Sequence, residues 1–221
     1  MYQRPSRAHA ASLPAAAQWR TDRPWTRMQG LVRSRDGQGD IDQALTRDPY
    51  PIPATADREG YHGERHFDYW LSGLKDYHLI MQRVQEVLER EGDPRADNGA
   101  QGGAGLTSGG RVLDFGCASG RVLRHFACQG NTLDVWGCDI APSHVAWVRR
   151  HLHPAIKAFD NHALPSLPLE DNSFDLVYAF SVFSHLDEHE LGWLLELRRI
   201  LRPGGFAYLT THTDHTWSIL S

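Results

Sequence analysis

Several classes of protein are disfavoured by what this 221-residue sequence lacks. It contains no apolar run close to the about 20 residues that cross a bilayer, and Met1 leads into no compact apolar stretch of the signal-peptide kind. The formal net charge is −4, so the composition shows none of the basic excess typical of nucleic-acid-binding proteins. We therefore expect a cytoplasmic protein that associates with neither membranes nor nucleic acids.

Cysteine is scarce and is not arranged in a metal-binding pattern. The three residues are Cys117, Cys128 and Cys138. An odd number without a Cys-x-x-Cys pair disfavours a disulfide framework and a zinc site, and favours small buried side chains. His212, Asp214 and His215 form a short cluster, but no third histidine-rich segment of fixed spacing accompanies it, so we predict no bound metal.

Sustained apolar periodicity is missing from the start of the chain. Residues 1–63 are rich in Pro, Arg, Gln and Asp, which predicts a mostly irregular N-terminal extension. Residues 64–92 carry apolar side chains every three or four positions, the period of a one-sided helix. Gly73 lies inside that helix and indicates a kink or a close contact. Residues 93–110 are rich in Gly and Ala and predict a flexible connector.

Residues 111–221 alternate between strand and helix patterns. The predicted strands cover residues 111–115, 133–138, 156–159, 174–180 and 206–211. Helices are predicted over 119–128 and 142–152, and a third is expected to begin at an apparent capping box, Asp187-Glu188-His189-Glu190. Strands that alternate with helices of about ten residues imply βαβ units and an α/β fold with a mostly parallel sheet.

The turn after the first predicted strand carries the strongest functional signal. It runs Asp114-Phe115-Gly116-Cys117-Ala118-Ser119-Gly120, so an acid ends the strand and glycines let the backbone approach a ligand at a helix N-terminus. Asp139 lies at the tip of the next predicted strand, where a carboxylate can accept hydrogen bonds from ribose hydroxyls. Because the Asp114 carboxylate would repel a pyrophosphate, the turn favours S-adenosylmethionine, which has a positive centre and an α-amino group, over a dinucleotide.

Four sequence motifs in order resemble one enzyme superfamily. Val-Leu-Asp-Phe-Gly-Cys-Ala-Ser-Gly-Arg (112–121) resembles the first motif of class I S-adenosylmethionine-dependent methyltransferases. Residues 135–139 resemble the second strand of that fold, 167–175 the approach to its fourth strand, and 201–205 the turn before its fifth. The resemblance covers residues 111–211 and implies a Rossmann-like three-layer α/β/α sandwich that binds S-adenosylmethionine and methylates a small-molecule acceptor.

A narrower resemblance concerns the acceptor. Ser-Val-Phe-Ser-His-Leu (181–186) and the segment 197–205 are similar to a bacterial branch often found near sugar and surface-polysaccharide genes. This similarity implies a sugar-type acceptor.

The superfamily resemblance assigns roles to individual residues. It implies that Asp114 holds the amino group of the cofactor, directly or through water, and that Asp139 binds its ribose. Ile140 and Phe180 are expected to flank the adenine and the methionine arm. The expected cofactor contacts are Asp114, Phe115, Gly116, Cys117, Ala118, Gly120, Asp139, Ile140, Asp160, Asn161 and Phe180.

Two positions depart from the family pattern. Ala118 stands where the family usually has a glycine, and its methyl group is tolerable where φ is negative. Ala163 stands where an acid typically contacts the adenine, so Asp160 or Asn161 is expected to serve instead, since an amide both donates and accepts.

Two histidines are candidate general bases. His185 and His212 follow the fourth and fifth predicted strands, at the carboxyl edge where open α/β sheets bind ligands. The alternative reading makes both ordinary surface or helix-flanking histidines.

The chain ends about ten residues after the fifth predicted strand, whereas the class I fold usually has seven. With strands six and seven missing, we expect either a truncated product or a partner chain that covers the strand-five edge. This ending and Ala118 keep open a non-catalytic S-adenosylmethionine-binding or assembly module. An NAD-dependent oxidoreductase is the other alternative, disfavoured by Asp114 and by the absence of a third glycine.

Overall fold

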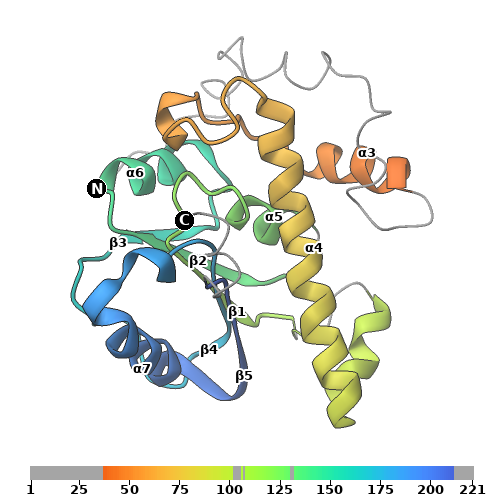
Figure 1. The fold of residues 1–221 in the computed structure, drawn as a ribbon. Coiled ribbons are helices and arrows are strands. Elements are labelled where there is room, and N and C mark those ends of the chain that lie inside the picture. Colours follow the sequence, from red (N-terminus) through yellow and green to blue (C-terminus); the bar gives the residue numbers. More distant parts are fainter. Residues whose placement is uncertain (1–36, 102–105, 107, 130–131, 212–221) are drawn as a thin grey trace, which may run out of the picture.

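The part of the chain that the computed structural model describes is built on one parallel sheet (Figure 1). The described residues are 37–101, 106, 108–129 and 132–211. Five strands lie in the order β3-β2-β1-β4-β5, and every neighbouring pair is parallel. They are β1 Arg111–Phe115, β2 Asp134–Asp139, β3 Lys157–Asp160, β4 Phe174–Ala179 and β5 Leu201–Leu209.

The helices differ in how their ends are formed. They are α3 Gly37–Arg47, α4 His66–Glu91, α5 Leu123–Cys128, α6 Pro142–His151 and α7 Glu190–Ile200. Short 3-10 helices are η2 Ala56–Arg58, η3 Pro94–Gln101, η4 Phe183–His185 and η5 Asp187–His189. The long helix α4 ends at Gly92, whose φ of 65° suits a glycine C-cap. Pro142 opens α6, where its missing N–H group costs nothing.

Helices cover both faces of the sheet, which confirms the predicted three-layer α/β/α arrangement (Figure 1). Strand side chains alternate between the faces. Val112 and Leu176 belong to a buried cluster shared with α4, α5 and α6. Their neighbours Leu113 and Val177 belong to a second cluster shared with α7.

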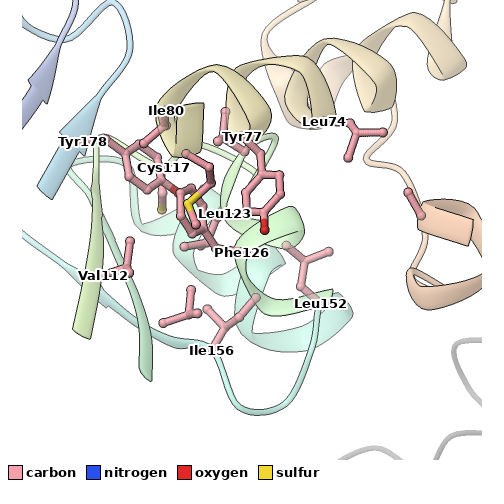
Figure 2. Packing of buried hydrophobic residues seen from close by; sticks show 14 of the residues in the cluster. Leu74, Tyr77, Ile80, Val112, Cys117, Leu123, Phe126, Leu152, Ile156 and Tyr178 are labelled. Atoms are coloured by element: carbon pink, nitrogen blue, oxygen red, sulfur yellow. The ribbon is translucent and has the colours of Figure 1, made fainter. Parts of the chain in front are cut away.

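Aromatic side chains join α4 to the sheet through α5. Tyr77 of α4 meets Phe126 of α5 edge-on, with 4.9 Å between ring centroids (Figure 2). Phe126 in turn stacks on Tyr178 of β4, also at 4.9 Å. Such pairs contribute about 0.5–1.5 kcal/mol each beyond the burial of their area. The helix predicted ahead of the sheet domain therefore shares one core with it.

A glycine permits this close packing of α4 on the turn before α5. A side chain at Gly73 would collide with the backbone carbonyl of Arg121 and would approach the His125 ring. The close contact predicted at this glycine is confirmed.

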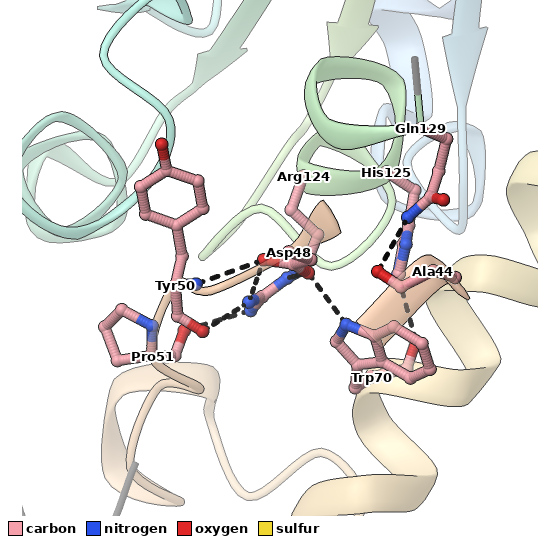
Figure 3. Close-up of polar contacts among 8 residues, drawn as sticks. All are labelled: Ala44, Asp48, Tyr50, Pro51, Trp70, Arg124, His125 and Gln129. Carbon is pink, nitrogen blue, oxygen red and sulfur yellow. Dashed lines mark hydrogen bonds and ion pairs between the residues drawn. The ribbon is translucent and has the colours of Figure 1, made fainter. Parts of the chain in front are cut away.

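A buried ion pair fastens the segment after α3 to α5 (Figure 3). The Nε of Arg124 donates to Oδ2 of Asp48 at 2.6 Å, and both side chains are 0% exposed. Trp70 Nε1 also donates to Oδ2 at 2.7 Å. Arg124 completes its bonding at the carbonyls of Tyr50 and Pro51. Buried charges are tolerated only when paired and hydrogen-bonded in this way.

The N-terminal region contains more regular structure than its composition indicates. Residues 1–63 were expected to be mostly irregular, yet their described part contains α3 and η2. Ile41, Ala44 and Leu45 of α3 are buried in the main core, a stripe too short to stand out as a period in the sequence. Within the expected connector, residues 93–110, Pro94–Gln101 forms a 3-10 helix.

Two local predictions near α7 and β5 are wrong. The expected capping box does not start the helix, because Asp187–His189 forms η5 and the N-cap of α7 is His189, which makes no side-chain capping bond. The expected turn at residues 202–205 lies inside β5 as a bulge. Phe174 pairs with Leu201, and the next pair joins Leu176 to Phe206.

β5 forms one edge of the sheet among the described strands. In the same described part of the chain, no helix combines the length and apolar character needed to span a membrane.

Candidate functional site

A pocket of about 850 Å³ opens at the carboxyl ends of the strands. The sheet side of its wall comes from the ends of β1, β2 and β4 and from the loops that follow β1, β2, β3 and β4. These lining residues include Asp114, Phe115, Gly116, Cys117, Ala118, Asp139, Ile140, Asn161, Phe180 and Val182. The crevice beyond the carboxyl ends of parallel strands is where open α/β sheets bind ligands.

The glycine-bearing turn is held against β2 by backbone hydrogen bonds. The N–H groups of Gly116 and Cys117 both donate to the carbonyl of Cys138 at 2.9 Å. Gly116 has a φ of 80°, and a side chain there would collide with Val182, so this position requires glycine. The bare backbone of the turn thus forms part of the pocket wall.

Ala118 adopts a left-handed conformation, with a φ of 44°. Alanine was expected to be tolerated here with a negative φ, and this expectation is wrong. The conformation aims the Ala118 N–H group at Oδ2 of Asp139, 2.7 Å away. A non-glycine residue in this region costs about 1–2 kcal/mol, which the surrounding contacts must offset.

Asp139 joins the two loops that border the pocket. Its Oδ2 accepts from Ala118, and its Oδ1 accepts from the N–H group of Ala141 at 2.8 Å. The Nδ1 of His144 lies 3.5 Å from Oδ1. Each carboxylate oxygen can accept a second hydrogen bond, so the group can still accept from a ligand.

Asp114 is a buried carboxyl at the end of β1, only 4% exposed. Burial raises its pKa to about 7, and the negative charge of Asp139 adds to the rise. The nearby Tyr178 hydroxyl and Arg121 guanidinium oppose the rise without cancelling it. A ligand ammonium group would favour the ionised form of such a carboxyl.

Comparison with known proteins agrees with this geometry. Residues 112–205 match the profile of a methyltransferase domain. A malonyl-[acyl-carrier protein] O-methyltransferase of Pectobacterium atrosepticum is 33% identical over 116 residues, which cover 52% of this chain and 43% of that protein. A protein of Mycolicibacterium smegmatis named "Probable S-adenosylmethionine-dependent methyltransferase" is 29% identical over 180 residues, 81% of this chain and 58% of its own length. Residues 112–205 therefore form a methyltransferase domain, of the kind found in S-adenosylmethionine-dependent methyltransferases.

Solved methyltransferase structures align with part of this chain. Phosphoethanolamine N-methyltransferase 2 of Haemonchus contortus, in complex with S-adenosyl-L-methionine, aligns with a TM-score of 0.42 and 22% identity, over 52% of this chain and 29% of that one. This chain spans less than two thirds of the length of each of these three relatives.

Most residues predicted from the sequence as cofactor contacts of a methyltransferase line the pocket, but two do not. A side chain at Gly120 would collide with Leu152, so this glycine serves the packing of the turn against the segment after α6. The Asp160 side chain is 52% exposed and lies 4.0 Å from Arg149, outside the pocket lining. Asn161 does line the pocket.

Of the two histidines predicted as candidate bases of a methyltransferase, the structure describes only one. His185, at the end of η4, is exposed and lines the pocket. His212 lies outside the described residues, as do Asp214 and His215. Within the described ranges, no three His, Cys, Asp or Glu side chains gather as a group that could hold a metal ion.

The residues that line the pocket on the side away from the sheet were not predicted from the sequence. Residues 57–62, here called the strap, run from η2 over the pocket, and Arg58 to His62 all line it. The Ser119 hydroxyl donates to the carbonyl of Asp57, and the Arg121 guanidinium lies 5.5 Å from the centre of the Tyr61 ring. No local motif marks the strap, because the contacts of Asp57 and Tyr61 with the glycine-bearing turn join positions about sixty residues apart in the sequence.

Proposed function

We propose that the protein is a cytoplasmic S-adenosylmethionine-dependent methyltransferase that methylates a small-molecule acceptor of sugar type. One observation carries the proposal. The acids Asp114 and Asp139 and the glycine-bearing turn between them border a single pocket, within a domain of this family.

The residues present fit the cofactor. The absence of a side chain at Gly116 leaves bare backbone for the methionine portion to approach. Ionised Asp114 suits the ammonium group, and Asp139 has acceptor capacity for ribose hydroxyls. Ile140, 61% exposed, offers an apolar surface to the adenine, and Asn161 can donate to and accept from its edge.

When bound, S-adenosylmethionine supplies a methyl group on a positively charged sulfur. The contribution of the chain is to hold the acceptor atom close and in line, which lowers the entropic part of the barrier. Phe180 provides an aromatic wall, and the exposed imidazole of His185 can take a proton from the acceptor. We further propose that a partner chain covers β5, which forms an edge of the sheet among the described strands.

Isothermal titration calorimetry tests the cofactor assignment. We expect S-adenosylmethionine and S-adenosylhomocysteine to bind and NAD to leave no signal. Asp139→Asn should weaken S-adenosylhomocysteine roughly ten- to hundred-fold, the loss expected for hydrogen bonds to a charged group. Asp160→Asn, outside the pocket, is the matched control and should bind as the wild type does. Binding of NAD without S-adenosylhomocysteine would refute the proposal.

A second assay addresses catalysis. Transfer of a labelled methyl group to a panel of sugars and other small molecules is expected for at least one acceptor. His185→Gln should then lower kcat with little change in cofactor affinity. An unchanged kcat would remove His185 from the reaction.

A further inference from the structure

Arg58 is a buried cation that leaves part of its bonding capacity unused. Arg58 is only 3% exposed, and it lines the pocket. The Nη2 group donates to the carbonyl of Gly63 and to Nδ1 of His66. The Nε and Nη1 groups have no hydrogen-bond partner. An unpaired buried donor on a charged group is unfavourable, so such an arrangement calls for a ligand or another explanation.

The other deeply buried arginine shows what a structural role requires. Arg124 is fully enclosed, and its guanidinium is bonded to both oxygens of Asp48 and to two backbone carbonyls. Arg58 has no carboxylate within ion-pair distance among the described residues. The guanidinium of Arg124 is therefore fully hydrogen-bonded, whereas that of Arg58 is only partly hydrogen-bonded and belongs to a residue that lines the pocket.

The strap side of the pocket carries one buried cation, Arg58, and the carboxylate of Glu59, which is 80% exposed. Burial lowers the pKa of His62, which favours its neutral form as a hydrogen-bonding group. His62, four residues on, also lines the pocket, and its Nε2 is buried without a partner. Arg121 lines the same wall, although its charge is already paired with Asp76 at 2.5 Å. The opposite wall carries the carboxyl groups of Asp114 and Asp139. A ligand with a cationic and an anionic end matches this division of charge.

We propose that Arg58, assisted by His62, forms a subsite for a carboxylate or phosphate group of the bound ligand. The free Nη1 or Nε group can donate a charge-assisted hydrogen bond to one oxygen of the anion, a type of bond for which arginine is well suited. Both free nitrogens are shielded from solvent, so binding of the anion requires the side chain to turn toward the pocket. This inference rests on the proposed function, and the anion belongs either to the carboxylate of the cofactor or to an anionic acceptor.

Calorimetry with a matched ligand pair tests the first source. Decarboxylated S-adenosylmethionine differs from S-adenosylmethionine only in lacking the carboxylate. If the subsite binds that carboxylate, the wild type should prefer the complete cofactor roughly ten- to hundred-fold. Arg58→Gln should abolish the preference by weakening the complete cofactor alone. Arg58→Lys, which keeps the charge but has a different arrangement of donors, should retain part of it.

A titration with inorganic phosphate tests the second source. If the subsite binds an acceptor anion, phosphate should bind to protein saturated with S-adenosylhomocysteine, and Arg58→Gln should lose this binding with unchanged cofactor affinity. Arg65→Gln is the matched control, because Arg65 lies on the exposed side of the same region, 64% exposed and paired with Asp68. It should behave as the wild type in both titrations.

The outcomes separate this inference from the proposed function. Wild-type protein that shows neither the carboxylate preference nor phosphate binding overturns the subsite, even where an Arg58 variant fails to fold. The same holds if Arg58→Gln and Arg58→Lys, shown folded by circular dichroism, keep both properties. Wild-type protein that binds neither S-adenosylmethionine nor S-adenosylhomocysteine would instead overturn the proposed function.

Discussion

Asp48 and Arg124 are 76 residues apart in the sequence and form a fully buried ion pair, with 2.6 Å between Oδ2 and Nε. Burial acts to raise the pKa of Asp48, but the charge and hydrogen bonds of Arg124, together with Trp70, outweigh it and leave the pKa below its ordinary value. The pair connects the segment that leads to the strap with the helix that follows the glycine-bearing turn. The ion pair thus connects the two walls of the pocket.

Breaking this pair should destabilise the protein strongly. Asp48→Asn leaves Arg124 buried without a counter-charge, so we expect a loss of about 3–5 kcal/mol in the free energy of unfolding. Urea unfolding followed by circular dichroism measures it. Glu86→Gln, which breaks the exposed Arg83–Glu86 pair, is the control and should cost less than about 1 kcal/mol. Equal effects of the two variants would contradict the structural role of the buried pair.

The same pair makes a contribution that depends on pH. A depressed pKa in the folded state means that the stabilisation is present above the unfolded value of about 3.9 and is lost as the pH falls through the folded value. The stability of Asp48→Asn should therefore decline less steeply than that of the wild type below about pH 4. Parallel acid-unfolding curves would count against the assignment.

Asp114 should make cofactor binding depend on pH near neutrality. Its pKa of about 7 means that the ammonium-binding form is lost as the pH falls below 7. We expect the affinity for S-adenosylhomocysteine to fall up to about tenfold per pH unit below that point, measured by calorimetry between pH 5 and 8. Asp114→Asn should bind weakly with no such dependence, and Glu188→Gln should follow the wild type. A wild-type affinity that is flat across this range would refute the role.

The raised pKa of Asp114 also predicts an opposite effect on the unliganded protein. For a carboxyl whose folded pKa is raised, stability is complete below the unfolded value of about 3.9 and is lost as the pH rises toward the folded value. Asp114→Asn should therefore stabilise the unliganded protein at pH 8 by more than about 1 kcal/mol. A thermal shift in the other direction would show that the carboxylate is needed for folding.

Ala118→Gly tests the left-handed conformation of the turn. Relief of the strain is worth about 1–2 kcal/mol, and the added freedom of glycine in the unfolded chain costs about 0.5–1 kcal/mol. The variant should be as stable as the wild type or more stable by up to about 1 kcal/mol. Ala127→Gly in α5 is the matched control and should lose about 1 kcal/mol. Equal losses in urea unfolding would exclude strain at Ala118.

Gly73→Ala should disturb the contact between α4 and the turn before α5. The added Cβ would overlap the backbone of Arg121, which cannot move without shifting the turn, so we expect a loss of about 2–3 kcal/mol. Gly192→Ala in α7 is the comparison, because its Cβ would meet only the Pro165 ring at 2.8 Å on a loop. Gly73→Ala should cost clearly more than Gly192→Ala in thermal unfolding, and the reverse order would contradict the packing described.

The parts of the site that sequence could predict are those determined by local spacing. Asp114 and Asp139 end consecutive strands of a parallel sheet, and this alternation alone places both at one edge. The central strands were predicted within a residue or two for the same reason, because buried parallel strands are short apolar runs.

The remaining features depend on contacts that spacing does not encode. Tyr61 lies against Arg121, about sixty residues along the chain, and the segment that contains Arg58 and Tyr61 has no apolar period. The positive φ at Ala118 accompanies a hydrogen bond to Asp139, 21 residues along the chain, and an alanine in the sequence does not reveal it. Gly120 belongs to the family motif, yet its lack of a side chain serves packing against Leu152.

The hydrogen bond from Ser119 to Asp57 closes a loop of 62 residues. Contacts of such separation tend to form late in folding, because the entropy of closing the loop must be overcome first. A ligand that touches both walls therefore recognises only the folded molecule. Cofactor binding would accordingly stabilise the contact between the strap and the turn, and would protect this segment from proteases.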